Sequence, residues 1–295
     1  MSDIKAQSMR GHGAMLLFSV LVAGSFSLGS IAAPMIEPSA LNAIRFLIAG
    51  AIIAPLVFLG PGLKREHLVA PWRYLLLGGL FAIYFVLMFE GLKFAPAIST
   101  SAVFTLTPVM SAGFGWLLLR QITTPRMTVA LTLAAMGAVW VIFRGNIDAI
   151  LAFNIGKGET IFFFGCVAHA IYTPLVRKLN RGEPTLVFTL GTLLAGFFVL
   201  SIYGAKDIVT TDWAALPAIV WITILYVAIF ASSATFFLLQ YASLNLPSAK
   251  VMAYTYLVPA WVILWEALMG NGFVEITVLA GVALTIVALL MLLKD

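Results

Sequence analysis

The sequence predicts an all-α polytopic membrane protein, with ten transmembrane helices arranged as two inverted five-helix repeats. Three observations support this prediction: the composition, the length of the apolar segments and an internal repeat. Of the 295 residues, 62% are hydrophobic and 10% are charged, whereas about 25% of the residues in soluble domains are charged. The mean hydropathy is +1.06. This composition excludes a soluble enzyme, which would need far more polar residues to cover its surface.

Ten segments are long and apolar enough to cross a bilayer, which takes about 20 residues of helix. Stretches rich in proline and glycine separate most of them. The first segment is longer than the apolar core of a signal peptide, about 7–15 residues, so it is interpreted as a retained span after a short cytoplasmic tail, residues 1–12. The predicted spans are 13–32, 39–60, 72–92, 96–119, 126–143, 158–176, 184–203, 214–238, 247–269 and 273–293.

Basic residues predict the orientation, because short cytoplasmic loops carry an excess of Lys and Arg. With the N-terminus inside, four basic residues fall outside, namely Lys93, Arg144, Lys157 and Lys206. Arg45 lies within a span. The cytoplasmic side then holds Lys5, Arg10, Lys64, Arg65, Arg73, Arg120, Arg126, Arg177, Lys178, Arg181, Lys250 and Lys294. Both termini are therefore expected in the cytoplasm, and the protein in a bacterial inner membrane.

An internal repeat relates the two halves of the chain. A shift of 151 residues places Pro96 on Pro247 and Pro108 on Pro259. Each half has five spans, an odd number, so the two halves are expected to have opposite orientations. Inverted repeats are typical of secondary transporters, which bind their solute between the halves. The predicted repeats are residues 13–147 and 148–295.

Several segments resemble one family of transporters. The sequence GLKFAPA at 91–97, followed by residues 99–108, resembles the junction of the third and fourth helices in the EamA type of the drug/metabolite transporter superfamily. YASLNLPSAKVMAYTYLVPA at 241–260 resembles the corresponding junction of the second half, and AIRFLIAG at 43–50 resembles the second helix. The resemblance covers the whole chain. It implies the ten-helix fold and, within the superfamily, is nearest to bacterial amino-acid exporters of broad or aromatic preference.

Aromatic and hydroxyl side chains share helical faces in five spans, the third, fourth, sixth, eighth and ninth. Such faces suit a cavity for an amphipathic solute, since rings hold apolar groups and hydroxyls bind ammonium or carboxylate groups. Ordinary helix packing produces the same pattern. The predicted substrate-binding residues are Tyr84, Met88, Thr100, Phe104, His169, Tyr172, Ser233, Lys250 and Tyr254.

Ionisable residues within spans are functional candidates, because they are expensive in lipid. His169 is the only histidine within a predicted span, and it either binds substrate, carries a proton or packs. Lys250 opens the ninth span, where it either snorkels to the interface or attracts an anion. Arg45 and Glu90 lie near the outer ends of adjacent spans and are expected to form a structural ion pair, with Glu266 as a competitor.

The sequence contains no HExxH, no Walker A and no paired intramembrane aspartates. We therefore expect no catalytic residues, no metal and no cofactor. The predicted function is a secondary transporter that exports small metabolites, best matched to apolar or aromatic amino acids, by alternating access. Two alternatives stay open: an organic phosphate or anion carrier using Lys250, and a membrane-embedded lipid-modifying enzyme. The expected partners are the solute and the bilayer, with no nucleic acid, and the protein is expected to function as a monomer.

Overall fold

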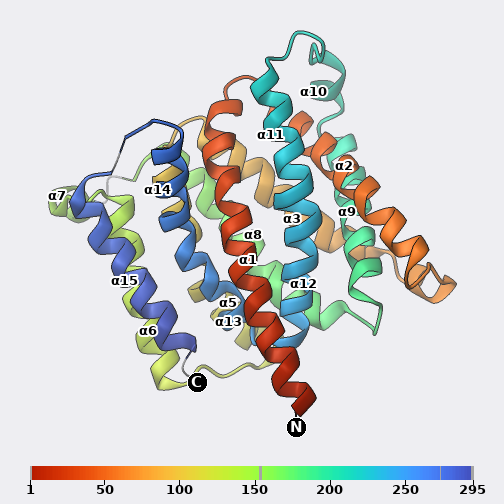
Figure 1. Ribbon diagram of the computed structural model, residues 1–295, viewed down its shortest axis with the longest axis horizontal. Helices are drawn as coiled ribbons and strands as arrows, with labels where there is room; N and C mark the ends of the chain where they lie inside the picture. Colours follow the sequence, from red (N-terminus) through yellow and green to blue (C-terminus); the bar gives the residue numbers. More distant parts are fainter. Residues whose placement is uncertain (1, 153–154, 273, 294–295) are drawn as a thin grey trace.

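The computed structural model describes residues 2–152, 155–272 and 274–293, and the regular elements in these ranges are all helical. Ten helical segments of this part of the chain are long and apolar enough to cross a membrane, and they form one bundle (Figure 1). The spans are α1 Ser2–Ala32, α2 Pro38–Leu59, α3 Trp72–Leu92, α4 Ala97–Phe104 with α5 Thr107–Leu119, α6 Pro125–Ile142, α8 Lys157–Leu179, α9 Thr185–Tyr203, α11 Ala218–Ala228 with η2 Ile229–Ala234 and α12 Thr235–Asn245, α13 Ser248–Ala253 with η3 Tyr254–Leu257 and α14 Val258–Leu268, and α15 Ile276–Leu293.

The predicted all-α architecture with ten spans is confirmed. The eighth span, predicted at 214–238, is found at Ala218–Asn245. Pro217 precedes its first residue, and its polar last turns continue as helix because Gln240 and Ser243 are buried and hydrogen-bonded. The first helix begins at Ser2, so it includes most of the predicted tail.

Both ends of the chain lie at the same end of the bundle (Figure 1), as an even number of spans requires. We call this the terminal end and the opposite one the far end. Short elements join the spans: η1 Arg65–Leu68 at the terminal end, and α7 Ile147–Leu151 and α10 Ala205–Thr210 at the far end. Lys294, one of the basic residues expected on the cytoplasmic side, lies outside the described residues.

The fourth and ninth spans are both interrupted at matching places. The fourth span breaks at Thr105 and Leu106, between α4 and α5, and the ninth passes through the 3₁₀ turn η3. Pro108 and Pro259 sit in the first turns of α5 and α14, where proline's missing N–H leaves no helical bond unmade. The two interruptions meet, since the hydroxyls of Thr107 and Thr255 are 3.3 Å apart.

The eighth span contains a six-residue π-helical stretch, η2, between α11 and α12. The helix ladder is widened there, and such π turns occur frequently at functional sites. The corresponding third span, α3, is a continuous α-helix. The two predicted halves therefore differ locally at this point.

Close helix crossings depend on glycine. A methyl group on Gly78 of α3 would run into the backbone of Gly196 on α9, and one on Gly137 of α6 would lie 2.7 Å from the carbonyl oxygen of Gly281 on α15. The pairs α2 with α9 and α6 with α15, each with extensive contacts, join spans that correspond in the predicted repeats. This pattern is expected of two related halves, although the division at residues 147 and 148 stays a prediction.

Candidate functional site

Five aromatic rings from four helices meet in the middle of the bundle. The imidazole of His169 on α8 lies 4.5 Å from the Tyr84 ring of α3 and 5.3 Å from the Phe104 ring of α4, centroid to centroid. Phe26 of α1 contacts Phe162 of α8 at 5.8 Å and Phe104 at 5.9 Å. We call these five residues the aromatic box. The box draws on both predicted halves, because α8 belongs to the second.

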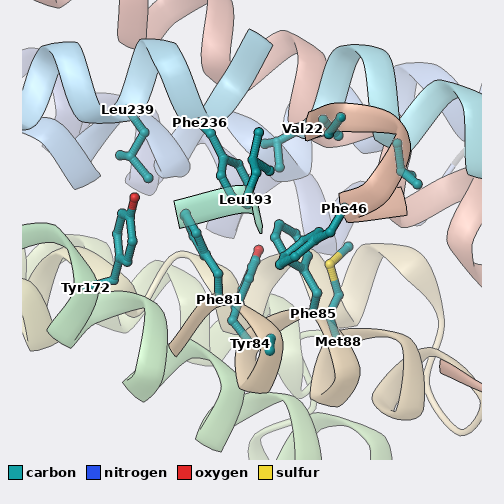
Figure 2. Close-up of a cluster of buried hydrophobic side chains, with 14 of the residues drawn as sticks. Val22, Phe46, Phe81, Tyr84, Phe85, Met88, Tyr172, Leu193, Phe236 and Leu239 are labelled. Carbon is teal, nitrogen blue, oxygen red and sulfur yellow. The ribbon is translucent and has the colours of Figure 1, made fainter. Parts of the chain in front are cut away.

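A second layer of rings packs against the box on its α2 and α12 side. Phe81 lies 3.9 Å from the Tyr172 ring and 4.0 Å from the Phe236 ring, and Figure 2 shows these three together. Phe85 contacts the Tyr84 ring at 4.6 Å. Met88 is fully buried one turn further along α3, next to Phe85 in Figure 2. The predicted residues Tyr84, Met88, Phe104, His169 and Tyr172 therefore lie in one continuous cluster.

Three buried polar atoms in this region have no hydrogen-bond partner among the residues that the structure describes. The Tyr84 hydroxyl and His169 Nδ1 are both buried and unpaired, as is the Ser27 hydroxyl of α1. A buried polar group without a partner destabilises a protein by about 1–3 kcal/mol, so each one calls for an explanation. The Tyr84 and His169 atoms can form directional bonds to a solute that enters between the rings.

Tyr172 differs from Tyr84, because its hydroxyl is held by a polar network. Gln240 donates from Nε2 to the Tyr172 hydroxyl at 2.8 Å and to the Thr192 hydroxyl at 3.2 Å. Thr189 donates to Gln240 Oε1 at 2.7 Å. These residues connect α8, α9 and α12. Tyr172 is thus a fixed wall of the cluster.

A polar contact joins α1 to η3 on the terminal side of the box, where Tyr254 Oη lies 3.0 Å from Nδ1 of His12. Nearer the middle of the bundle, the Trp261 indole donates to the Ser19 hydroxyl at 3.2 Å. His12 belongs to the first span, Gln7–Ala32, so the expectation that His169 is the only span histidine is wrong. The sequence prediction started the span one residue too late to include it. Lys250 is half-buried on α13 at the terminal end.

Two predicted site residues have hydroxyls that bond backbone carbonyls. The Thr100 hydroxyl donates to the Pro96 carbonyl of its own helix at 2.9 Å. The Ser233 hydroxyl lies in the seam between η2 and α2, where it donates to the Ala228 carbonyl at 2.8 Å and approaches the Ala49 carbonyl at 3.4 Å. Ser233 therefore lies in the seam with α2, whereas Thr100 stands one turn from Phe104 on α4 with its hydroxyl already bonded. Hydroxyls that bond their own helix are indistinguishable from free ones in a sequence.

The expected ion pair between Arg45 and Glu90 is wrong. Glu90 pairs with Lys93, the residue that follows α3, at 3.0 Å. Arg45 faces η2 instead, where Nε donates to the Ser232 hydroxyl at 2.5 Å. Glu266 accepts a bond from Asn271 at 2.7 Å and does not pair with Arg45. The Arg45 guanidinium lies over Phe85, five residues before Glu90 along α3, so the two side chains differ in depth as well as in direction.

Ion pairs fasten both ends of the bundle. At the terminal end, Arg73 donates to Glu183 at 2.6 Å, and both are buried. Burial alone would raise the pKa of Glu183, but the hydrogen bonds from Arg73 and the Arg181 backbone outweigh it and hold this pKa below its usual value. At the far end, Lys93 bridges Glu90 and Glu37 of the loop between α1 and α2. Burial opposes the charge of Lys93, and the two carboxylates raise its pKa above the usual value.

No group of three His, Cys, Asp or Glu side chains is placed to hold a metal ion in the part of the chain that the structure describes. What the central site offers is therefore aromatic surface, one hydroxyl and one imidazole nitrogen. Phe26 and Phe85 belong to this surface but were not among the predicted site residues. Their sequence signal, an isolated phenylalanine in an apolar span, is the same as that of ordinary packing.

Comparison with known proteins identifies the family. A family model described as the EamA-like transporter family matches residues 9–143 and 156–294. The chain belongs to the EamA-like transporter family. This confirms the resemblance seen in the sequence, and with the ten spans it makes the EamA-like protein a multi-pass membrane transporter.

Individual relatives agree with this assignment. The EamA-like chain is 25% identical to the uncharacterized transporter YyaM of Bacillus subtilis, over 94% of this chain and 91% of that protein. It is 28% identical to an uncharacterized transporter of Archaeoglobus fulgidus, over 84% of this chain and 85% of that protein. A solved crystal structure, 19% identical, covers 98% of this chain and 97% of the other with a TM-score of 0.72, so the two share a fold.

Proposed function

We propose that this transporter exports small metabolites, namely amino acids with apolar or aromatic side chains, across a bacterial inner membrane. The observation that carries the proposal is the aromatic box, in which the Tyr84 hydroxyl and His169 Nδ1 are buried without partners. The proposal places the terminal end of the bundle, with both termini, in the cytoplasm. The protein is proposed to function as a monomer.

The chemistry of the box suits such a solute. Rings arranged edge to face bind an apolar or aromatic side chain. A tyrosine hydroxyl and an imidazole nitrogen can accept hydrogen bonds from an ammonium group or donate them to a carboxylate, depending on the imidazole tautomer. A solute that satisfies both atoms removes the penalty of leaving them unpaired.

Alternating access would use contacts at the two ends as gates. The contact between His12 and Tyr254 closes the terminal end, and the Lys93–Glu37 ion pair closes the far end. The paired interruptions around Thr107 and Thr255 supply bending points next to the box, because irregular backbone in a membrane is tolerated where it lines a path. Each gate would open while the other stays closed.

Solute counterflow in proteoliposomes tests this function. Labelled phenylalanine and leucine should exchange, and His169→Ala should lower the exchange rate at least about tenfold, the loss expected for one buried hydrogen bond. Phe198→Leu, on an exposed face of α9, is the matched control and should exchange at the wild-type rate. Exchange of organic phosphates instead of amino acids, or no flux with chemical conversion of lipid, would contradict the proposal.

A further inference from the structure

Arg45 is a fully buried cation inside a spanning helix, with 0% of its surface exposed. Its hydrogen-bond partners are all neutral. Nε donates to the Ser232 hydroxyl at 2.5 Å, Nη2 to the Ala231 carbonyl at 2.5 Å and Nη1 to Asn42 Oδ1 at 3.3 Å. Charged groups in membrane interiors are rare and are usually paired with an opposite charge. Arg45 therefore requires an explanation.

The transporter's own acids do not neutralise this charge. The ten spans contain three acidic residues, and all three lie toward the far end. Glu90 pairs with Lys93, Glu159 accepts the Ser99 hydroxyl at 2.5 Å, and Glu266 bonds Asn271. Among the described residues, Arg45 thus has no carboxylate partner.

The Arg45 guanidinium has more N–H groups than its three hydrogen bonds use. Arginine carries five N–H groups, and the three bonds use one on each nitrogen. Two N–H groups therefore remain, one on each terminal nitrogen, without an acceptor among the described residues. A pair of terminal N–H groups matches the two oxygens of a carboxylate.

A single aromatic ring separates Arg45 from the box. The guanidinium carbon lies 3.5 Å from the centroid of the Phe85 ring, and Phe85 contacts the Tyr84 ring at 4.6 Å. Figure 2 shows Phe85 between Phe46 and Tyr84. The ring face gives Arg45 a weak cation–π contact, which a carboxylate would replace with stronger charge-assisted bonds.

We propose that Arg45 binds the carboxylate of the transported solute, so that this transporter selects carboxylates over otherwise identical uncharged or cationic molecules. The inference rests on the proposed function, since it places the carboxylate beside the box that holds the side chain. The π-helical η2 positions the guanidinium through Ser232 and Ala231. Phe85 moves aside when the carboxylate enters.

Matched ligand pairs test the carboxylate site on the wild-type protein. Phenylalanine is compared with phenylalanine amide, and phenylacetate with phenethylamine, by the rise in melting temperature in detergent and by competition in counterflow. The carboxylate member of each pair should bind at least about tenfold more tightly, the ratio expected for one charge-assisted pair. Equal binding within both pairs overturns the carboxylate site.

Variants then assign the selectivity to a residue. Arg45→Lys keeps the positive charge but loses the planar guanidinium, whose paired N–H groups bind both oxygens of a carboxylate. The preference for phenylalanine over its amide should therefore fall at least about tenfold. Arg73→Lys, at the other buried arginine, is the matched control and should keep the preference. Selectivity that survives Arg45→Lys but disappears in Lys250→Met overturns the assignment. If Arg45→Lys does not fold, Ser232→Ala, which removes a bond that positions the guanidinium, takes its place and should lower the preference; an unchanged preference overturns the assignment.

The outcomes separate this inference from the proposed function. Flux of phenylalanine and its amide at equal rates leaves amino-acid transport standing and overturns the carboxylate site. Stabilisation by phenylacetate without flux of any amino acid keeps the site and overturns the proposed function. Binding of neither member of either pair overturns both.

Discussion

Tyr84 and Tyr172 are buried to the same degree on facing helices, yet their hydroxyls have opposite surroundings. Gln240 donates to the Tyr172 hydroxyl, whereas the Tyr84 hydroxyl has no partner. A satisfied buried hydroxyl stabilises the fold, and an unsatisfied one destabilises it. We therefore interpret Tyr172 as a structural residue of the site and Tyr84 as a residue that binds the solute.

Removing the two hydroxyls should therefore change stability in opposite directions. Tyr84→Phe should raise the free energy of unfolding by about 1 kcal/mol, because a buried unpaired group is lost. Tyr172→Phe should lower it by about 1–2 kcal/mol, because Gln240 loses an acceptor. Melting temperatures in detergent, without added solute, measure both, and counterflow should fall in Tyr84→Phe despite its greater stability. A fall in stability for both variants would mean that the Tyr84 hydroxyl is bonded in solution.

The sequence alone indicated the positions of some residues around the box but not of others. The aromatic residues Tyr84, Phe104 and His169 were found because bulky polar-aromatic side chains lie on shared faces. Ser233 was misplaced because a hydroxyl's partner is invisible in a sequence. The neutral ligands of Arg45 could not be foreseen, since they come from a π turn that no local pattern announces.

At the scale of helices, the crossing of α3 and α9 is fixed by glycine on both sides. A methyl group at Gly78 would press on the Gly196 backbone and come within 2.7 Å of the Thr192 carbonyl oxygen. At the neighbouring Gly79, an added methyl meets nothing within 4 Å. Backbone atoms cannot move aside as a flexible side chain does, so the two positions should respond differently.

Alanine substitutions at these adjacent positions test the crossing. Gly78→Ala should destabilise the protein by about 1–3 kcal/mol through overpacking. Gly79→Ala should be neutral or stabilising by about 0.5–1 kcal/mol, because alanine favours the helix. Thermal unfolding of both variants in one detergent is the measurement. Equal losses would contradict the close approach of α3 and α9.

The spans themselves were predictable because a bilayer imposes length and apolarity on every helix. The aligned prolines Pro108 and Pro259, which lie beside the interruptions of the fourth and ninth spans, were found from the sequence alone. The π-helix η2 was not, because its apolar and serine residues fit an α-helix equally well. Contacts with α2, such as the bonds from Arg45 to Ser232 and Ala231, favour a π-helix over an α-helix at this point.

For the whole molecule, the buried pair of Arg73 and Glu183 joins α3 to the loop between α8 and α9, and so connects the two predicted halves. Because the pKa of Glu183 is held below its usual value of 4.5, the folded state favours the carboxylate. The pair therefore stabilises the fold fully at pH values above 4.5, and this stabilisation is lost as the pH falls through the lowered pKa.

Acidification should therefore erase the effect of removing this carboxylate. Glu183→Gln should lower the melting temperature at about pH 7, and the gap to the wild type should narrow as the pH falls from about 5 toward 3. Glu66→Gln, on a side chain that is 69% exposed, is the matched control and should leave the pH profile unchanged. A gap that stays constant over this range would show that the pair is not electrostatic.

The aromatic box between the two predicted halves is the proposed binding site for the solute. Photo-crosslinking with p-azidophenylalanine as the free solute, followed by peptide mapping, tests it most directly. We expect labelling around Tyr84, Phe104 and His169, from α3, α4 and α8, that excess unlabelled phenylalanine suppresses. Labelling confined to exposed positions such as Phe164 and Trp116, unaffected by phenylalanine, would contradict it.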